Sequence, residues 1–168
     1  INSNKFPLAT TNTDLLFTDE HIFSLSIYFT SSIGYIKSGL NTDPALGFTV
    51  VNQTKLFITG SGSSTDWRKN FVSPVTGNFA FGNIVVSPKK LYGLAPIVNA
   101  IPMIRLSEMY YIAAECEAAS NTIAATTLLN AVRTHRNLSA YTVPALSSDS
   151  LGVEISKEYQ KEFMGEGQ

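Results

Sequence analysis

Residues 101–168 decide the fold; the stretch opens IPMIRLSEMYYIAAEC (101–116) and closes EYQKEFMGEGQ (158–168). From Met103 to Ala119 there is no Gly or Pro, and Pro102 stands just before, where a missing backbone N–H costs least. Apolar residues recur at helical spacing, which predicts a helix over this run. The predicted face is largely apolar and comprises Leu106, Met109, Tyr110, Ala113, Cys116 and Glu117. We expect Cys116 to be a small buried hydrophobe there.

Two further helices follow. Ser120 or Asn121 is a candidate N-cap for a helix from Thr122 to about Arg136. The connection is short, so the first two helices should pack antiparallel as an αα-hairpin. The third helix should run from about Leu151 to Met164. Its candidate N-caps are Ser148, Asp149 and Ser150, its apolar line is Leu151, Ile155, Tyr159 and Phe163, and Gly165 is a plausible residue just beyond its end.

The hairpin has the outline of a tetratricopeptide unit, which is about 34 residues long. The predicted fold class is therefore mainly α: a tetratricopeptide-like hairpin and a further helix, packed with a loop-rich region that contains short strands. We assign residues 1–100 to the loop-rich, ligand-facing region and residues 101–168 to the helical part of one incomplete domain. In the first region we predict strands over His21–Phe29 and Phe48–Val51, and a short helix that is capped by Asn52 and runs through Phe57 or Ile58.

Composition narrows the possible partners. The net charge is −1, which gives no indication of nucleic acid or of an anionic membrane surface as a partner. No apolar run approaches the roughly 20 residues of a spanning helix.

No catalytic or metal-binding pattern is visible in the sequence. His21 and His135 are far apart and lack partners at zinc spacing, and there is no Gly-x-Ser-x-Gly elbow. We therefore predict no catalytic residue, no cofactor and no metal. A calcium site lined by carbonyl oxygens leaves no sequence signature and stays an open alternative.

The charged residues of the helices have a structural explanation. Glu108, Glu115, Glu158 and Glu162 lie on predicted helices that also carry Arg105, Arg133 and Arg136. We interpret these residues as interhelical ion pairs.

Three blocks of the helical region resemble the signature of the SusD/RagB family, glycan-binding outer-membrane lipoproteins of Bacteroidetes-type bacteria. Arg105–Glu108 and Ala114–Cys116 resemble its R-x-x-E…A-E-A block, with Cys116 in place of the last Ala. Leu129–Arg136 resembles its L-N-x-V-R-x-R block, one residue longer before the last Arg. Glu158–Gly167 resembles its E-R-x-x-E-F-x-x-E-G block.

Two upstream elements are similar to the family as well. Asp66-Trp67-Arg68 resembles its D-x-R element, and Asp19–Phe23 resembles its E-x-I-F strand. Relative to the family pattern, this sequence looks like a middle-to-late fragment. The family's N-terminal helices and lipid-anchored cysteine would precede Ile1, and its W-x-D-L-x-R segment would follow Gln168.

The resemblance implies capture without chemistry. An oligosaccharide or polysaccharide would be bound at the bacterial outer surface by an outward-facing lipoprotein. It would then pass to a SusC-like TonB-dependent outer-membrane transporter, and the lipid anchor outside these residues would be the only membrane contact.

Three aromatic residues are candidates for sugar binding. Sugar rings present C–H faces that stack on aromatic side chains, and Trp67 has the polar neighbours Asp66, Arg68, Lys69 and Asn70. Tyr35, in a Gly- and Ser-flanked loop, and Tyr92 are weaker candidates. Trp67 also fits a second interpretation, in which it is half-buried beneath a loop.

Two other functions stay open. A tetratricopeptide-like domain could bind a protein or peptide and no glycan. A hydrolase would need two carboxylates facing one cleft, and Asp66 would be the first to test.

Overall fold

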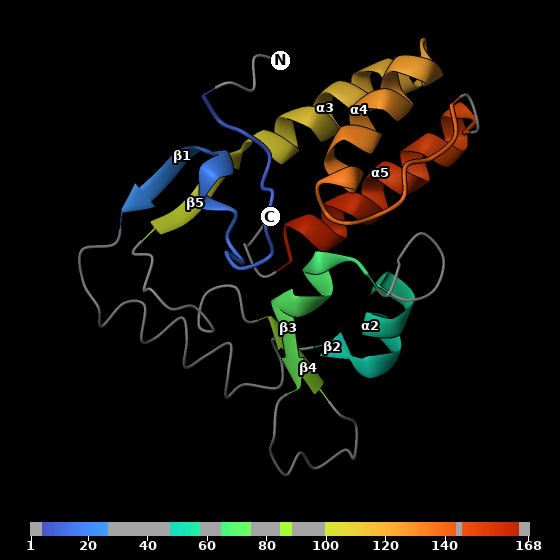
Figure 1. Ribbon diagram of the computed structural model, residues 1–168. Helices are drawn as coiled ribbons and strands as arrows, with labels where there is room; N and C mark the ends of the chain where they lie inside the picture. The colour runs from blue at the N-terminus through green and yellow to red at the C-terminus, as the bar shows by residue number, and fades with distance from the viewer. Residues whose placement is uncertain are drawn as a thin grey trace.

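The computed structural model describes residues 5–26, 48–57, 65–74, 85–88, 100–143 and 146–164. Three helices form its largest part: α3 (Leu106–Ala118), α4 (Thr122–Thr134) and α5 (Ser148–Glu162). Figure 1 shows α3 and α4 side by side, with α5 packed against them. The prediction of a mainly α chain with short strands is confirmed.

Two small sheets accompany the helices. Strand β1 (His21–Ser26) pairs antiparallel with β5 (Ala100–Arg105), and the cross-strand partners include Phe23 and Ile104. Strand β4 (Val85–Pro88) lies between β2 (Phe48–Thr49) and β3 (Val72–Pro74). Helix α2 (Val50–Phe57) follows β2 directly, and the 3-10 helix η3 (Trp67–Phe71) leads into β3. The expected strand and helix near residues 48–57 are therefore present, but the strand ends at Thr49. Helix α2 already starts at Val50, so Asn52 lies inside the helix and is not its cap.

Helix α3 begins later than predicted. Ala100–Arg105 is a strand, so Met103 and Ile104 are not helical, and the helix starts at Leu106. The helical spacing of the apolar residues continues backwards into this strand, but pairing with β1 decides the backbone conformation there. Pro102 thus lies inside a short two-stranded ribbon and not at a helix start.

The buried face of α3 also differs from the predicted one. Its buried residues include Ser107, Tyr111, Ala114 and Ala118, which is a face rotated from the one that carries Met109 and Ala113. Cys116 is exposed, so the expectation of a buried cysteine is wrong. The rotation places Tyr111, which is fully buried, toward α5, where its ring packs against Tyr159 and Phe163.

The αα-hairpin is confirmed. Asn121 is the N-cap of α4, and its side-chain oxygen accepts a hydrogen bond from the Ala124 N–H at 3.1 Å. Small buried residues, Ala114 on α3 and Ala125 on α4, lie in the same hydrophobic core.

Helix α5 starts three residues before the predicted Leu151. Its N-cap is Ser147, whose hydroxyl accepts a hydrogen bond from the Ser150 N–H at 3.3 Å, and not one of the three predicted residues. Leu151, Ile155 and Phe163 are buried as expected, and Tyr159 packs against the core. Gly165 lies outside the described residues.

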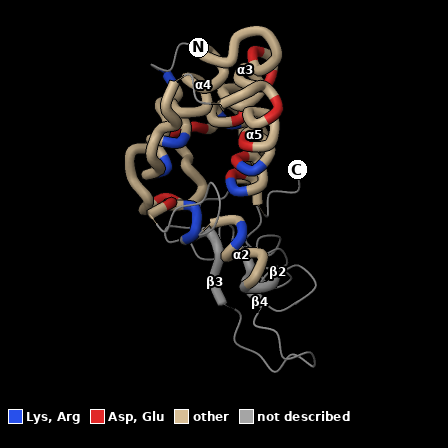
Figure 2. Tube along the Cα trace, turned by 90° about the vertical axis from the view of Figure 1, so that its right-hand side faces the viewer, with Lys and Arg blue, Asp and Glu red and all other residues tan. Residues whose placement is uncertain are grey.

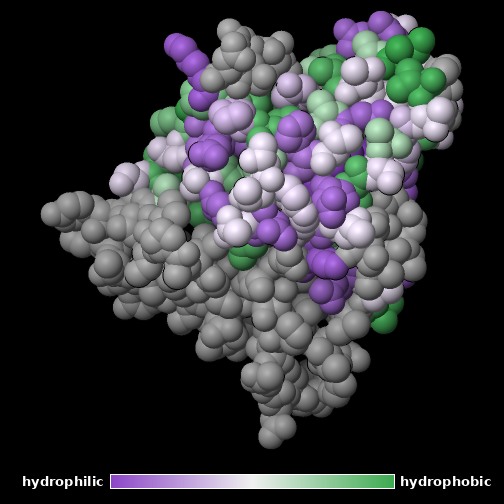
Figure 3. Space-filling model, viewed as in Figure 1, coloured by the Kyte–Doolittle hydropathy of each residue, from purple (hydrophilic) through white to green (hydrophobic). Residues whose placement is uncertain are grey.

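Several large hydrophobic side chains remain at the surface. On the β1–β5 ribbon, Phe23 is 52% exposed, Leu25 47% and Ile104 39%. In Figure 3 the described part of the viewed face mixes hydrophobic and hydrophilic side chains.

Candidate functional site: a buried ion cluster beside Trp67

Two carboxylates on the buried face of α5 are the centre of the site. Glu158 and Glu162 are one helical turn apart and fully buried, continuing the line of Leu151 and Ile155. Acidic and basic positions alternate along this end of α5 in Figure 2. Two like charges so placed would repel each other unless cations lay between them and around them.

Glu162 is bound by three arginines. Arg136 binds it through two nitrogens, with Nε 3.1 Å from Oε2 and Nη2 2.8 Å from Oε1. Arg105 reaches Oε1 from the β5–α3 junction at 3.2 Å, and its Nη2 donates to the Glu162 main-chain carbonyl at 2.9 Å. Arg68 completes the set, with Nη1 3.3 Å from Oε2.

Glu158 also has three cationic partners. Arg133 Nη1 lies 2.7 Å and Lys161 Nζ 3.1 Å from its Oε1, while Arg68 Nη2 donates to Oε2. Arg68 therefore bridges the two glutamates of α5.

Arg68 is held in place by its own turn. Asp66 accepts from Arg68 Nε at 3.0 Å through Oδ1 and from Nη2 at 2.8 Å through Oδ2. This two-bond geometry suits a planar guanidinium. Arg68 Nη1 also lies 3.4 Å from the Tyr111 hydroxyl.

The N-terminal segment is connected to these charged groups through Glu20. Its carboxylate pairs with Arg136 at 2.8 Å and also accepts from the Ala9 N–H at 2.8 Å. The Arg136 guanidinium lies over the Phe17 ring, 3.9 Å from its centroid.

We call these residues the ion cluster: Glu20, Asp66, Arg68, Arg105, Arg133, Arg136, Glu158, Lys161 and Glu162. All are buried, so each charge has lost most of its hydration. Such a charge is tolerated only when partners replace the lost water, and deleting one partner typically costs about 3–5 kcal/mol. The cluster therefore fixes the segments that supply it relative to one another.

The charges shift one another's pKa values. Burial alone would raise the pKa of Glu162, but Arg136 and Arg105 outweigh it and hold that pKa well below the usual range. The pKa of Glu158 is lowered in the same way, with Arg68, Lys161 and Arg133 outweighing burial. Burial lowers the pKa of Lys161, and Glu158 offsets only part of that shift. Both glutamates are thus ionised at neutral pH.

The prediction that these residues form ion pairs is confirmed for Glu158, Glu162, Arg105, Arg133 and Arg136, but of these pairs only Arg133–Glu158 joins two helices. Arg105 ends strand β5, and Arg136 follows the end of α4. Glu115 is exposed on α3 and is not among the residues of the cluster.

The sequence-based interpretation missed the part of Glu20 in this cluster. It is 116 residues from Arg136, its partner, so no local spacing connects the two. For the cluster as a whole, a signal was present in α5. Glu158 and Glu162 continue the buried line of Leu151 and Ile155, and buried carboxylates require buried cations.

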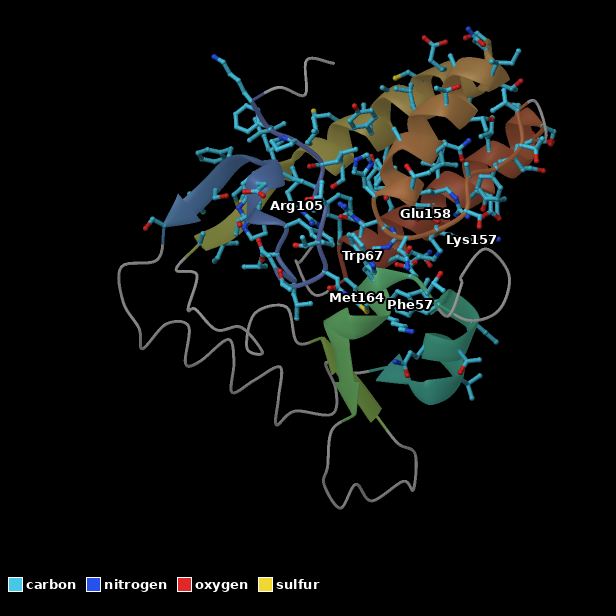
Figure 4. The ribbon with its side chains drawn as sticks, viewed as in Figure 1. Phe57, Trp67, Arg105, Lys157, Glu158 and Met164 are labelled. Atoms are coloured by element: carbon cyan, nitrogen blue, oxygen red, sulfur yellow. The ribbon has the colours of Figure 1, made fainter. Side chains whose placement is uncertain are left out.

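Trp67 lies between two members of the ion cluster. It begins η3, and its half-buried side chain follows Asp66 and precedes Arg68, both fully buried. Figure 4 labels Trp67 together with Arg105 at the β5–α3 junction and Glu158 on α5. Tyr35 and Tyr92, the other two predicted binding residues, lie outside the described residues.

Other site types find no support in the described part of the chain. Among those residues no three His, Cys, Asp or Glu side chains form a group suited to a metal ion. The described helices also include none with the length and apolarity that crossing a membrane requires.

A model of the SusD family matches residues 34–168, so the chain belongs to the SusD family. Seven charged residues of the blocks that resemble the family signature meet in the ion cluster: Asp66 and Arg68, Arg105, Arg133 and Arg136, Glu158 and Glu162. In this chain these seven charged residues therefore belong to a buried scaffold.

Solved structures share the fold. A SusD-like carbohydrate-binding protein from Bacteroides vulgatus matches with a TM-score of 0.70 and 19% identity, covering 98% of this chain and 37% of its own. Surface glycan-binding protein A from Bacteroides uniformis matches with a TM-score of 0.69 and 19% identity, covering 100% of this chain and 41% of its own. The chain thus spans about two fifths of the length of these proteins. Comparison with curated proteins finds no match.

Proposed function

We propose that this SusD-family protein binds an oligosaccharide or polysaccharide without transforming it. The observation that carries the proposal is the family match over residues 34–168, whose signature residues build the ion cluster. Two proteins of the same fold are described as carbohydrate-binding or glycan-binding, which supports the same ligand class here.

Binding without catalysis agrees with the charges of the described residues. A glycosidase needs a carboxylic acid that stays protonated, with a raised pKa. Glu158 and Glu162 have lowered pKa values, and Asp66 is bound to Arg68 through two hydrogen bonds. The ion cluster therefore supports a structural task for these carboxylates.

We further propose that the protein is an outward-facing lipoprotein of the outer membrane that delivers its glycan to a SusC-like TonB-dependent transporter. The family resemblance is the basis of this step. Pull-down from outer membranes tests it: recovery of a TonB-dependent transporter is expected, and consistent recovery without one would contradict the delivery step.

Glycan binding is tested by affinity electrophoresis of the protein against plant, host and microbial polysaccharides. We expect retardation by at least one of them. If none of the panel retards the protein, glycan capture is the wrong assignment.

The assignment of Trp67 to the binding site has a matched pair of variants. Trp67→Ala should remove most of the retardation with little change in Tm, while Trp67→Phe keeps an aromatic face and much of the binding. Loss of retardation and Tm together in Trp67→Ala would identify the side chain as part of the core.

A second candidate function is protein or peptide binding without a glycan, through the β1–β5 ribbon that leads into the tetratricopeptide-like hairpin. The observation that favours it is the exposed apolar pair Phe23 and Ile104, which face each other across the β1–β5 ribbon. Retention of the protein by an immobilised peptide library, lost in Phe23→Ser, would support this function over glycan capture.

A further inference from the structure

Two turns that are 72 residues apart are joined by three hydrogen bonds beside the ion cluster. The Trp67 N–H donates to the Arg136 carbonyl at 3.1 Å. The Thr65 hydroxyl donates to the Asn137 carbonyl at 2.9 Å, and the Asn137 side-chain amide donates to the Thr65 carbonyl at 3.0 Å. We call these three bonds the Thr65–Asn137 clasp.

The residue type at position 137 suits the clasp in two ways. Its φ is 60°, in the left-handed region that most residues avoid and that Gly, Asn and Asp adopt most readily. Of these three, only Asn carries an amide that can donate to the Thr65 carbonyl. A hydrogen bond from the Leu138 N–H to the Arg133 carbonyl, at 3.0 Å, sets the position of Asn137 in the turn after α4.

The clasp determines where Trp67 can lie. Asp66 and Arg68 on either side of it are fixed in the ion cluster, and so is Arg136, whose carbonyl receives the Trp67 N–H. The Asn137 amide holds Thr65, two positions before Trp67, at the exposed edge of the same turn. The main chain at Trp67 is thus anchored from both sides, while the indole is only half-buried.

We infer that Asn137 is a positioning residue for Trp67: its side-chain amide fixes the turn that presents the indole to a glycan. The inference rests on the proposed function where it concerns the glycan. The link between Asn137 and the position of Trp67 is independent of any ligand.

The test uses Asn137→Gly, because Gly adopts the left-handed conformation readily and lacks the side chain that carries the amide. The matched control is Asn121→Gly, which removes one side-chain hydrogen bond at the other end of α4, far along the helix from Trp67. Trp67 is the single tryptophan among the 168 residues, so acrylamide quenching of fluorescence reports on it. Each of these proteins is also made with Trp67→Phe. Subtracting the fluorescence of that version removes any signal that does not come from Trp67.

We expect Asn137→Gly to raise the acrylamide quenching constant of Trp67, while Asn121→Gly leaves it unchanged. Binding to the polysaccharide that retards the unaltered protein should weaken by about two- to tenfold in Asn137→Gly, the loss that one hydrogen bond supports. Quenching that matches the unaltered protein, or an equal change in Asn121→Gly, would overturn the inference. If no polysaccharide binds the unaltered protein, the proposed function fails, and the quenching result still decides whether Asn137 positions Trp67.

Discussion

Single side chains of the ion cluster differ in how much the fold depends on them. Glu158 and Glu162 each accept hydrogen bonds from three cationic groups, so removing either leaves several buried cations without a partner. Lys161 is different, because Glu158, to which it donates a hydrogen bond, is also bound by Arg68 and Arg133. The cost of a substitution should therefore depend on what it leaves behind.

Lys161→Met tests this difference. The methionine has a similar length and carries no charge, so the desolvation of the buried ammonium group disappears while Glu158 keeps two arginines. We expect the free energy of unfolding, measured by urea denaturation, to change by less than about 1 kcal/mol or to rise. A loss of about 3 kcal/mol or more would show that Glu158 depends on Lys161.

At the level of helices and strands, sequence periodicity predicted which elements exist better than where they begin. Three helices and the αα-hairpin were predicted, yet Met103 and Ile104 belong to a strand. Their conformation is set by pairing with β1, some 80 residues earlier, and the spacing of neighbouring residues does not reveal that pairing. The buried face of α3 was missed for a similar reason, because Tyr111 packs toward α5 and reaches Arg68.

The ion cluster, too, could be predicted only in part from the sequence. Ion pairing of the α5 glutamates with Arg105, Arg133 and Arg136 could be predicted from charges on neighbouring helices. The pairing of Glu20 with Arg136 could not be predicted, because the two residues meet only in the folded chain. The binding role of Trp67 stays a prediction.

The start of α5 gives a prediction at this scale. Ser147→Ala removes the hydroxyl that caps the helix, and it should lower the free energy of unfolding by about 1 kcal/mol. The neighbouring Ser148→Ala is the control, because Ser148 is exposed within the first turn and is not the cap. Equal effects of the two changes in thermal denaturation would contradict the assignment of Ser147 as the N-cap.

For the whole molecule, the ion cluster connects segments from Glu20 to Glu162. It joins the N-terminal segment, the turn that carries Trp67, the β5–α3 junction and the ends of α4 and α5. The N-terminal segment and the turn that carries Trp67 are in this way attached to the helices by charge pairs that are buried.

This arrangement predicts loss of stability in acid. The pKa values of Glu158 and Glu162 are lower in the folded chain than the ordinary 4.5. The unfolded chain therefore takes up protons first as the pH falls, so the stabilisation is complete above about pH 5 and is lost as the pH drops through the folded-state values. Urea denaturation at a series of pH values should show this decline, and it should be shallower in Glu162→Gln. A free energy of unfolding that stays constant down to about pH 3 would contradict the prediction.

The measurement that tests the account most directly is the free energy of unfolding of Glu162→Gln, with the exposed Glu115→Gln on α3 as its control. Glu162 holds three arginines, so its loss should cost about 3–5 kcal/mol, while the control should stay within about 0.5 kcal/mol of the unaltered protein. That result would establish the ion cluster, with its seven charged residues from the SusD-family signature blocks, as the buried scaffold of this chain. Equal, small effects of both substitutions would contradict it.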